Sequence, residues 1–79
     1  MSPKMPIITA KVMMNFLEYL GFQKVRQRGS HCFFRHYDGR TATVPDHVSE
    51  DLGRGITSKI FRDAEVNRDD FMEWYSKRS

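Results

Sequence analysis

The segment FQKVRQRGSHCFFRHYDGRTATVP, residues 22–45, decides the fold of this 79-residue chain. It has no apolar stripe at helical spacing, and two glycine-containing pairs, Gly29-Ser30 and Asp38-Gly39, interrupt it. A Gly-Ser pair fits a two-residue hairpin turn with glycine first, and Asp-Gly is among the strongest short hairpin signals. The pattern therefore predicts three antiparallel strands, which cover residues 22–28, 31–37 and 40–44, with Pro45 ending the third.

Two-residue turns would fix the pairing of these strands and assign each side chain to one face of the sheet. The predicted pairs are Arg28 with His31, Arg26 with Phe33, Lys24 with Arg35, Tyr37 with Arg40, Arg35 with Ala42 and Phe33 with Val44. One face is then basic and aromatic, and carries Lys24, Arg26, Arg28, His31, Phe33, Arg35, Tyr37 and Arg40. The other face, which we expect helices to cover, carries Val25, Gln27, Cys32, Phe34, His36, Thr41 and Thr43. A β-bulge or a covering partner would explain why the apolar Phe33 and Val44 fall on the basic face.

Helices are predicted on both sides of the strands, because apolar residues recur there at helical spacing. The first covers residues 10–20, with Thr9 as its N-cap and Gly21 ending it. The second covers residues 57–64, with Thr57 or Ser58 as its cap.

A short last helix is predicted over residues 68–77, because Asn67 followed by Asp70 resembles a capping box. We interpret residues 1–8, with two prolines, as an extended lead-in, and residues 46–55 as a polar connection. The order is helix, three-stranded antiparallel meander, helix, short helix, which predicts a single α+β domain over 1–79 with one sheet backed by helices. The α-β-β-β-α order is that of double-stranded-RNA-binding domains.

Composition narrows the class of partner and the compartment. The single cysteine, Cys32, excludes an intrachain disulfide, is expected to be buried, and favours a reducing compartment, which we take to be the cytoplasm. We find no signal peptide and no apolar run long enough for a membrane span. The net charge is +3, and residues 22–40 hold five basic residues against one acid, which favours a polyanionic partner.

A histidine at the start of a strand and among cations suits chemistry on a phosphodiester. Histidine as a residue type can act as a base or an acid at neutral pH, and His31 is the histidine in this position. Planar guanidinium groups can bond two phosphate oxygens at once. The residues expected to contact such a phosphodiester are Lys24, Arg26, Arg28, Gly29, Ser30 and Arg35. From the residues alone, His31 could equally be a structural residue beside a loop, and Ser30 could bond only its own backbone.

An ordered set of short motifs closely resembles one family over residues 9–75. The motifs are Gly21-Phe22, the run Arg26 to His31, Phe34-Arg35-His36, Asp38-Gly39-Arg40, Val44-Pro45 with His47, Ile60 with Arg62-Asp63-Ala64, and Phe71. The chain resembles the HicA toxins, the small mRNA interferases of HicA–HicB toxin–antitoxin modules. The resemblance implies ribosome-independent RNA cleavage, with the histidine of the Gly-Ser-His motif, His31, as the catalytic residue. It also implies a HicB antitoxin that covers the active site.

The expected mechanism uses the 2′-hydroxyl of the RNA as nucleophile, needs no metal or other cofactor, and leaves a 2′,3′-cyclic phosphate and a 5′-hydroxyl. A second acid or base is needed, and His47 is a better candidate than His36, which is predicted on the opposite face. Two other functions stay open on the same fold. One is a non-catalytic RNA-binding module, and the other is a protein-interaction module whose basic face binds an acidic partner.

Overall fold

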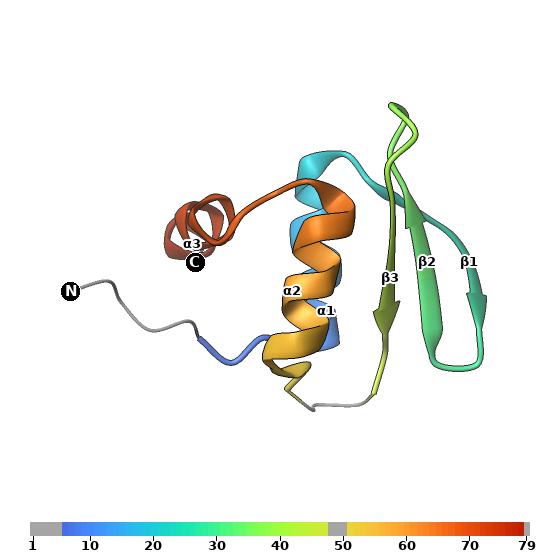
Figure 1. Cartoon of the computed structure of the whole chain (residues 1–79), viewed down its shortest axis with the longest axis horizontal. Coiled ribbons are helices and arrows are strands. Elements are labelled where there is room, and N and C mark those ends of the chain that lie inside the picture. Colours follow the sequence, from blue (N-terminus) through green and yellow to red (C-terminus); the bar gives the residue numbers. More distant parts are fainter. Residues whose placement is uncertain (1–5, 48–50, 79) are drawn as a thin grey trace.

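The computed structural model describes residues 6–47 and 51–78, and its elements follow the predicted order (Figure 1). They are α1 Ala10–Leu20, β1 Gln23–Arg28, β2 His31–Arg35, β3 Thr41–Pro45, α2 Gly53–Ala64 and α3 Arg68–Lys77. The strands form one antiparallel sheet in the order β1-β2-β3. The prediction of an α+β fold like that of a double-stranded-RNA-binding domain is confirmed.

Both predicted caps of the first helix are present. The Thr9 hydroxyl accepts a hydrogen bond from the Val12 N–H at 3.3 Å, and Gly21 ends α1 at a φ of 105°. The capping box of α3 is also confirmed, because the side chains and backbone amides of Asn67 and Asp70 bond reciprocally at 2.9 and 3.0 Å. These local signals fix where α1 and α3 begin.

The predicted start of the second helix is wrong by four residues. Helix α2 begins at Gly53, where the Asp51 carboxylate accepts the Gly53 N–H at 3.0 Å, and Thr57 is a buried residue inside the helix. Asp51 therefore bonds the first turn, so neither Thr57 nor Ser58 is needed as a cap.

The described part of the lead-in is tied to the start of α2. The buried Ile8 accepts a hydrogen bond from the Leu52 N–H at 2.9 Å, and Thr9 forms a β-bridge with Asp51. Residues 1–5 of the predicted lead-in and residues 48–50 of the predicted connection lie outside the described residues.

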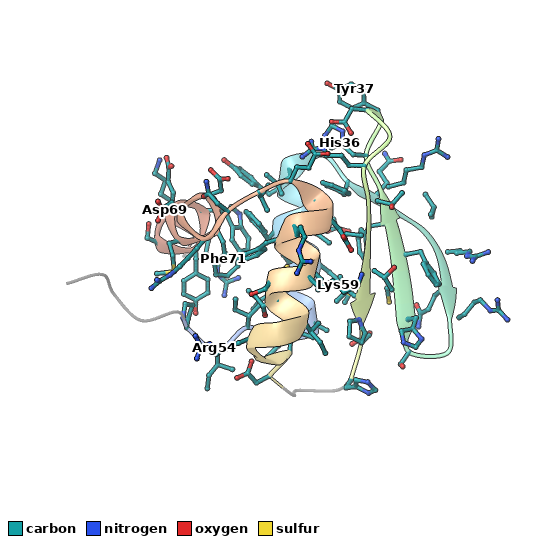
Figure 2. All side chains as sticks on the ribbon, in the orientation of Figure 1. His36, Tyr37, Arg54, Lys59, Asp69 and Phe71 are labelled. Atoms are coloured by element: carbon teal, nitrogen blue, oxygen red, sulfur yellow. The ribbon has the colours of Figure 1, made fainter. Side chains whose placement is uncertain are left out.

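The elements form layers, with α1 and α2 covering one face of the sheet and α3 lying beyond them (Figure 1). The core lies between the sheet and the helices, and it includes Cys32, Phe34, Ala42 and Val44 from the strands. Phe71 lies between α3 and the other two helices (Figure 2), with its ring 5.1 Å from that of Phe16 and 5.7 Å from that of Phe61. Phe71 is fully buried, so its ring joins α3 to the core. None of the helices among residues 6–47 and 51–78 is long and apolar enough to cross a membrane.

The predicted register of the second hairpin is wrong by one residue. Its loop has three residues, Tyr37 to Gly39, closed by a hydrogen bond from the His36 N–H to the Arg40 carbonyl at 2.8 Å. Gly39 has a φ of 102°, as a three-residue hairpin loop with a bulge requires. Phe33 therefore faces Thr43 instead of Val44, and Val44 faces Cys32 in the core. A shift of one residue moves every side chain of a strand to the other face, which removes the unexplained apolar Val44 from the basic face.

The first hairpin has the predicted two-residue turn, with a β-bulge further along β1. Arg28 pairs with His31 and Arg26 with Phe33, as predicted, but the register then shifts at Val25. Lys24 pairs with Phe34 instead of Arg35. Because paired residues share a face, the bulge places Lys24 on the side opposite His31.

Candidate nucleic-acid interface

The turn before His31 is held by contacts from β1 and from the residue that follows β3. Gly29 has a φ of 57°, in the left-handed region that glycine adopts without strain. The Gln27 side-chain amide donates a hydrogen bond to the Gly29 carbonyl at 3.0 Å, and the Asp46 N–H donates one to the Ser30 carbonyl. The turn therefore fixes His31 as the first residue of β2.

His31 lies in the central strand, between Arg28 of β1 and Pro45 of β3. Its side chain is exposed. Within the described parts of the chain, its ring has no hydrogen-bond or ion-pair partner. Both ring nitrogens are therefore available to a ligand, which is what proton transfer to or from a bound group requires.

The sheet face opposite the helices is basic, and we call it the open face. Its residues are Gln23, Arg26, Arg28, His31, Phe33, Arg35, Thr41, Thr43 and Pro45. The three strands contain no acidic residue. In the described chain, neither Arg28 nor Arg35 forms an ion pair. The guanidinium groups on this face are thus available to phosphate oxygens.

Three residues predicted on this face lie elsewhere. Lys24 is on the opposite side of β1, where its ammonium bonds the Gln27 side chain at 3.2 Å. Tyr37 projects from the tip of the β2–β3 loop and is 94% exposed (Figure 2). Arg40 turns back toward α2, with its guanidinium 5.2 Å above the Phe22 ring. The bulge at Val25 and the three-residue loop are the physical reasons for these differences.

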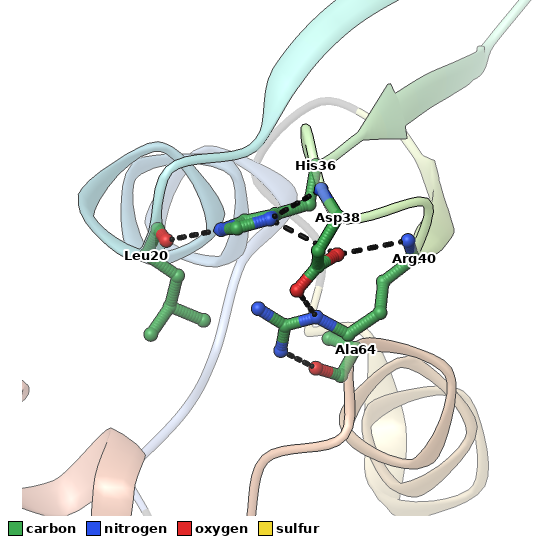
Figure 3. A network of polar contacts seen from close by, with 5 residues as sticks. All are labelled: Leu20, His36, Asp38, Arg40 and Ala64. Carbon is green, nitrogen blue, oxygen red and sulfur yellow. Dashed lines mark hydrogen bonds and ion pairs between the residues drawn. The ribbon is translucent and has the colours of Figure 1, made fainter.

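His36 is a structural residue, joined to the ends of both major helices through the network in Figure 3. Its Nε2 lies 3.0 Å from the carbonyl of Leu20, the last residue of α1, and must therefore carry the proton of this hydrogen bond. Its Nδ1 lies 3.2 Å from the Asp38 N–H and 3.0 Å from Asp38 Oδ1. Arg40 extends the network by donating to Asp38 Oδ2 at 2.8 Å and to the carbonyl of Ala64, the last residue of α2. We call these three residues, His36, Asp38 and Arg40, the loop clamp.

Asp38 is the acidic member of the loop clamp. The hydrogen bond from the Arg40 N–H, with the Arg40 guanidinium and His36 nearby, lowers the pKa of the Asp38 carboxyl from its ordinary 3.8. A lowered pKa means that the ionised carboxylate is the form that these contacts stabilise.

His47 comes two residues after Pro45, the β3 residue that pairs with His31, and is exposed. The Asp46 hydrogen bond to Ser30 holds the backbone of this segment against the turn that carries His31. The topology therefore brings His47 to the same end of the sheet as His31, whereas His36 lies at the other end of β2.

Comparison with known protein families identifies the chain. Residues 10–66 match the family model described as the HicA toxin of bacterial toxin-antitoxin. The chain belongs to the HicA toxin family. A search of curated proteins found no match. The matched range runs from the start of α1 to just past α2, and α3 lies beyond it.

Membership in the HicA family assigns this chain a toxin function within a bacterial toxin–antitoxin module and implies an antitoxin as its partner. The matched residues contain the whole open face and the loop clamp. The elements that carry this HicA chain's candidate interface therefore lie within the range that the family model matches.

The sequence did not reveal all residues that build the site. Gln27 was predicted on the helix-covered face, and only the structure shows its amide bonding the turn. Thr41 and Thr43 were predicted on the covered face and lie on the open one. Counting Tyr37 into the loop would have corrected both threonines, but the Asp-Gly pair favours a two-residue turn.

Proposed function

We propose that this HicA toxin is an endoribonuclease in which the His31 imidazole transfers a proton during cleavage. The observation that supports this most strongly is an exposed histidine, free of hydrogen-bond partners in the described chain, on a face that holds three arginines and no acid. Its neighbours Arg28 and Arg26 would bind the phosphate, and Arg35 the adjoining backbone.

The chemistry requires little from the protein because RNA carries its own nucleophile. A base takes the proton of the 2′-hydroxyl, whose oxygen then attacks the neighbouring phosphorus. The bond from phosphorus to the 5′-oxygen breaks, and an acid protonates that oxygen. The products are a 2′,3′-cyclic phosphate and a 5′-hydroxyl, and no metal or other cofactor takes part in these steps.

The arginines would stabilise the charge that develops on the phosphorane oxygens, because each planar guanidinium can bond two of them. The backbone of Gly29 and the Ser30 hydroxyl lie in the turn beside His31 and would contact the same phosphate. Lys24 lies on the other side of β1. It stays a predicted contact for the part of the RNA that would run past the edge of the sheet.

His47 is our candidate for the second proton transfer, because its segment is anchored beside the turn that carries His31. His36 is not a candidate, since the residue is only 6% exposed and both of its ring nitrogens are engaged, one by Leu20 and one by Asp38. One imidazole would act as base and the other as acid.

The antitoxin in this proposal is a HicB-type protein that covers the open face. A partner that lays acidic or apolar groups over His31, Phe33 and Arg35 would inhibit the toxin by occupying its site. Charge complementarity supports this, because the strands of the open face have no acid of their own.

The mechanism is tested with a short single-stranded RNA and matched oligonucleotides that carry a 2′-deoxy sugar at the cleaved position, in the presence of EDTA. We expect cleavage of the RNA with a cyclic phosphate product, and none at the deoxy position. Cleavage of the deoxy substrate, or loss of RNA cleavage on chelation, would overturn the mechanism.

The alternatives are separated by the wild-type protein and His31→Ala in cleavage, binding and growth assays. Cleavage and growth arrest that survive His31→Ala would refute the assignment of His31. RNA binding without cleavage by the wild-type protein would instead identify a non-catalytic RNA-binding module. If the wild-type protein neither binds nor cleaves RNA, a protein-interaction module is the remaining function.

A further inference from the structure

One aromatic ring on the open face is not required by the fold. Phe33 is half-buried, yet it belongs neither to the buried core nor to the apolar residues that pack against the core. Among the described aromatic residues, none pairs with its ring. Its strand neighbours Cys32 and Phe34, by contrast, are fully buried against the helices.

The surroundings of Phe33 are cationic and polar. Arg26, directly across from it in β1, holds its guanidinium 4.7 Å above the ring centroid, and Thr43 lies across from it in β3. His31 and Arg35 are two residues away on the same face of β2. An apolar ring among cations is complementary to a nucleobase with its phosphates, and less so to an apolar peptide.

We propose that Phe33 is a stacking platform for a nucleobase next to the phosphodiester that His31 cleaves. This inference rests on the proposed function and adds a positioning residue to it. Two strand residues span about 7 Å at a rise of about 3.3–3.4 Å each, so a base on Phe33 would lie about one step of an extended single strand from His31. Proteins that read single-stranded RNA stack its unpaired bases on aromatic side chains and on arginine planes.

Arg26 is the second part of this platform. Its guanidinium and the Phe33 ring lie one over the other, so they offer two flat surfaces of different character. A base stacks on either kind of surface, while the charge of Arg26 attracts the adjoining phosphate. Because every base has a flat face, this platform would position the RNA without selecting one base strongly.

The test measures binding in a His31→Ala background, so that cleavage does not consume the probe. The probe is a fluorescent single-stranded RNA of about 10 nucleotides, within the usual length of a single-strand site. Compared with the His31→Ala parent protein, we expect the added Phe33→Leu change to weaken binding by about 5- to 150-fold. The added Phe33→Trp change should keep the affinity of the parent protein. The matched control is Tyr37→Leu, which removes an exposed aromatic from the loop tip and should leave the affinity unchanged.

An abasic scan of the same RNA identifies the stacked position. Removing the base that stacks on Phe33 should weaken binding of the RNA to the parent protein. The same abasic RNA should bind the Phe33→Leu variant no more weakly than the intact RNA does. Unchanged affinity of a folded Phe33→Leu variant, checked by thermal unfolding, would overturn the proposal. A variant that loses only antitoxin binding would overturn it too, by assigning Phe33 to the antitoxin interface. Because these are binding measurements, they can succeed even if RNA cleavage by the wild-type protein is never observed.

Discussion

The two ends of strand β2 use the same residue types in opposite ways. At its start, His31 follows a glycine turn and lies between Arg28 and Pro45, exposed and without a partner in the described chain. Beyond its end, His36 also lies beside a glycine-containing loop and an arginine, but its ring is buried and bonded on both sides. The comparison teaches that residue type alone does not identify a site, and that the number of engaged ring nitrogens separates the two histidines.

The largest expected effect separates these two histidines directly. His31→Ala should lower RNA cleavage by roughly 10²–10⁴-fold, because it removes a proton-transfer group. The free energy of unfolding should change by no more than about 0.5 kcal/mol, because the ring is exposed. His36→Ala should do the reverse, with a loss of about 2–4 kcal/mol of stability, because its ring packs against Phe22 at 5.1 Å and bonds Leu20.

Both variants are measured by urea unfolding and by cleavage per folded molecule of the same RNA. A folded His36→Ala protein that no longer cleaves RNA would contradict the division between the two ends of the strand. An unfolded His31→Ala protein would contradict it as well.

The second-largest expected effect is that of a substitution at Gly21, and it tests His36 as a packing residue. A Cβ added at Gly21 would lie 2.9 Å from His36 Nε2, and Gly21 also has a positive φ of 105°. We expect Gly21→Ala to cost about 1–3 kcal/mol. Gly39→Ala is the matched control, because its φ of 102° is similar but, apart from its two chain neighbours, no described residue has an atom within 4 Å of the added Cβ.

Gly39→Ala should therefore cost less than Gly21→Ala, and the difference should shrink in a His36→Ala background. The measurement is chemical denaturation of the two variants in both backgrounds. If Gly21→Ala costs the same free energy of unfolding in the wild-type and His36→Ala backgrounds, the contact with His36 adds nothing to the backbone strain.

The smallest effect concerns the carboxylate of the loop clamp. The folded pKa of Asp38 is lowered, chiefly by the Arg40 N–H, so its contribution to stability is present above the ordinary pKa of 3.8 and is lost as pH falls through the folded value. Asp38→Asn should be less stable than wild type near neutral pH, with the gap closing at acid pH. Urea unfolding of both proteins along a pH series tests this, and a gap that widens toward acid pH would contradict it.

The fold was predictable because its signals are local. Thr9, Gly21 and the Asn67–Asp70 capping box each act within a few residues, and the observed helix ends agree with them. The two-residue turn at Gly29 fixed the pairing of Arg28 with His31 for the same reason.

The parts that sequence could not supply depend on contacts between distant residues. Tyr37 joins the second loop because His36 and Arg40 pair with each other and bond α1 and α2, and no short-range signal announces this. The bulge at Val25 likewise moves Lys24 to the other face without a glycine or proline to mark it. The motif was enough to select His31 as the candidate histidine, which stays a prediction, whereas the exact composition of the open face required the register.

The loop clamp has a consequence for the order in which the chain matures. The His36–Leu20 bond spans 16 residues and the Arg40–Ala64 bond spans 24. A chain growing on the ribosome therefore contains the complete His31 motif well before the acceptor for Arg40 has been made. Since domains generally fold as units, the sheet that presents His31 becomes fully supported only after α2 has emerged. The open face of the nascent toxin is thus completed only after Ala64 has been synthesised.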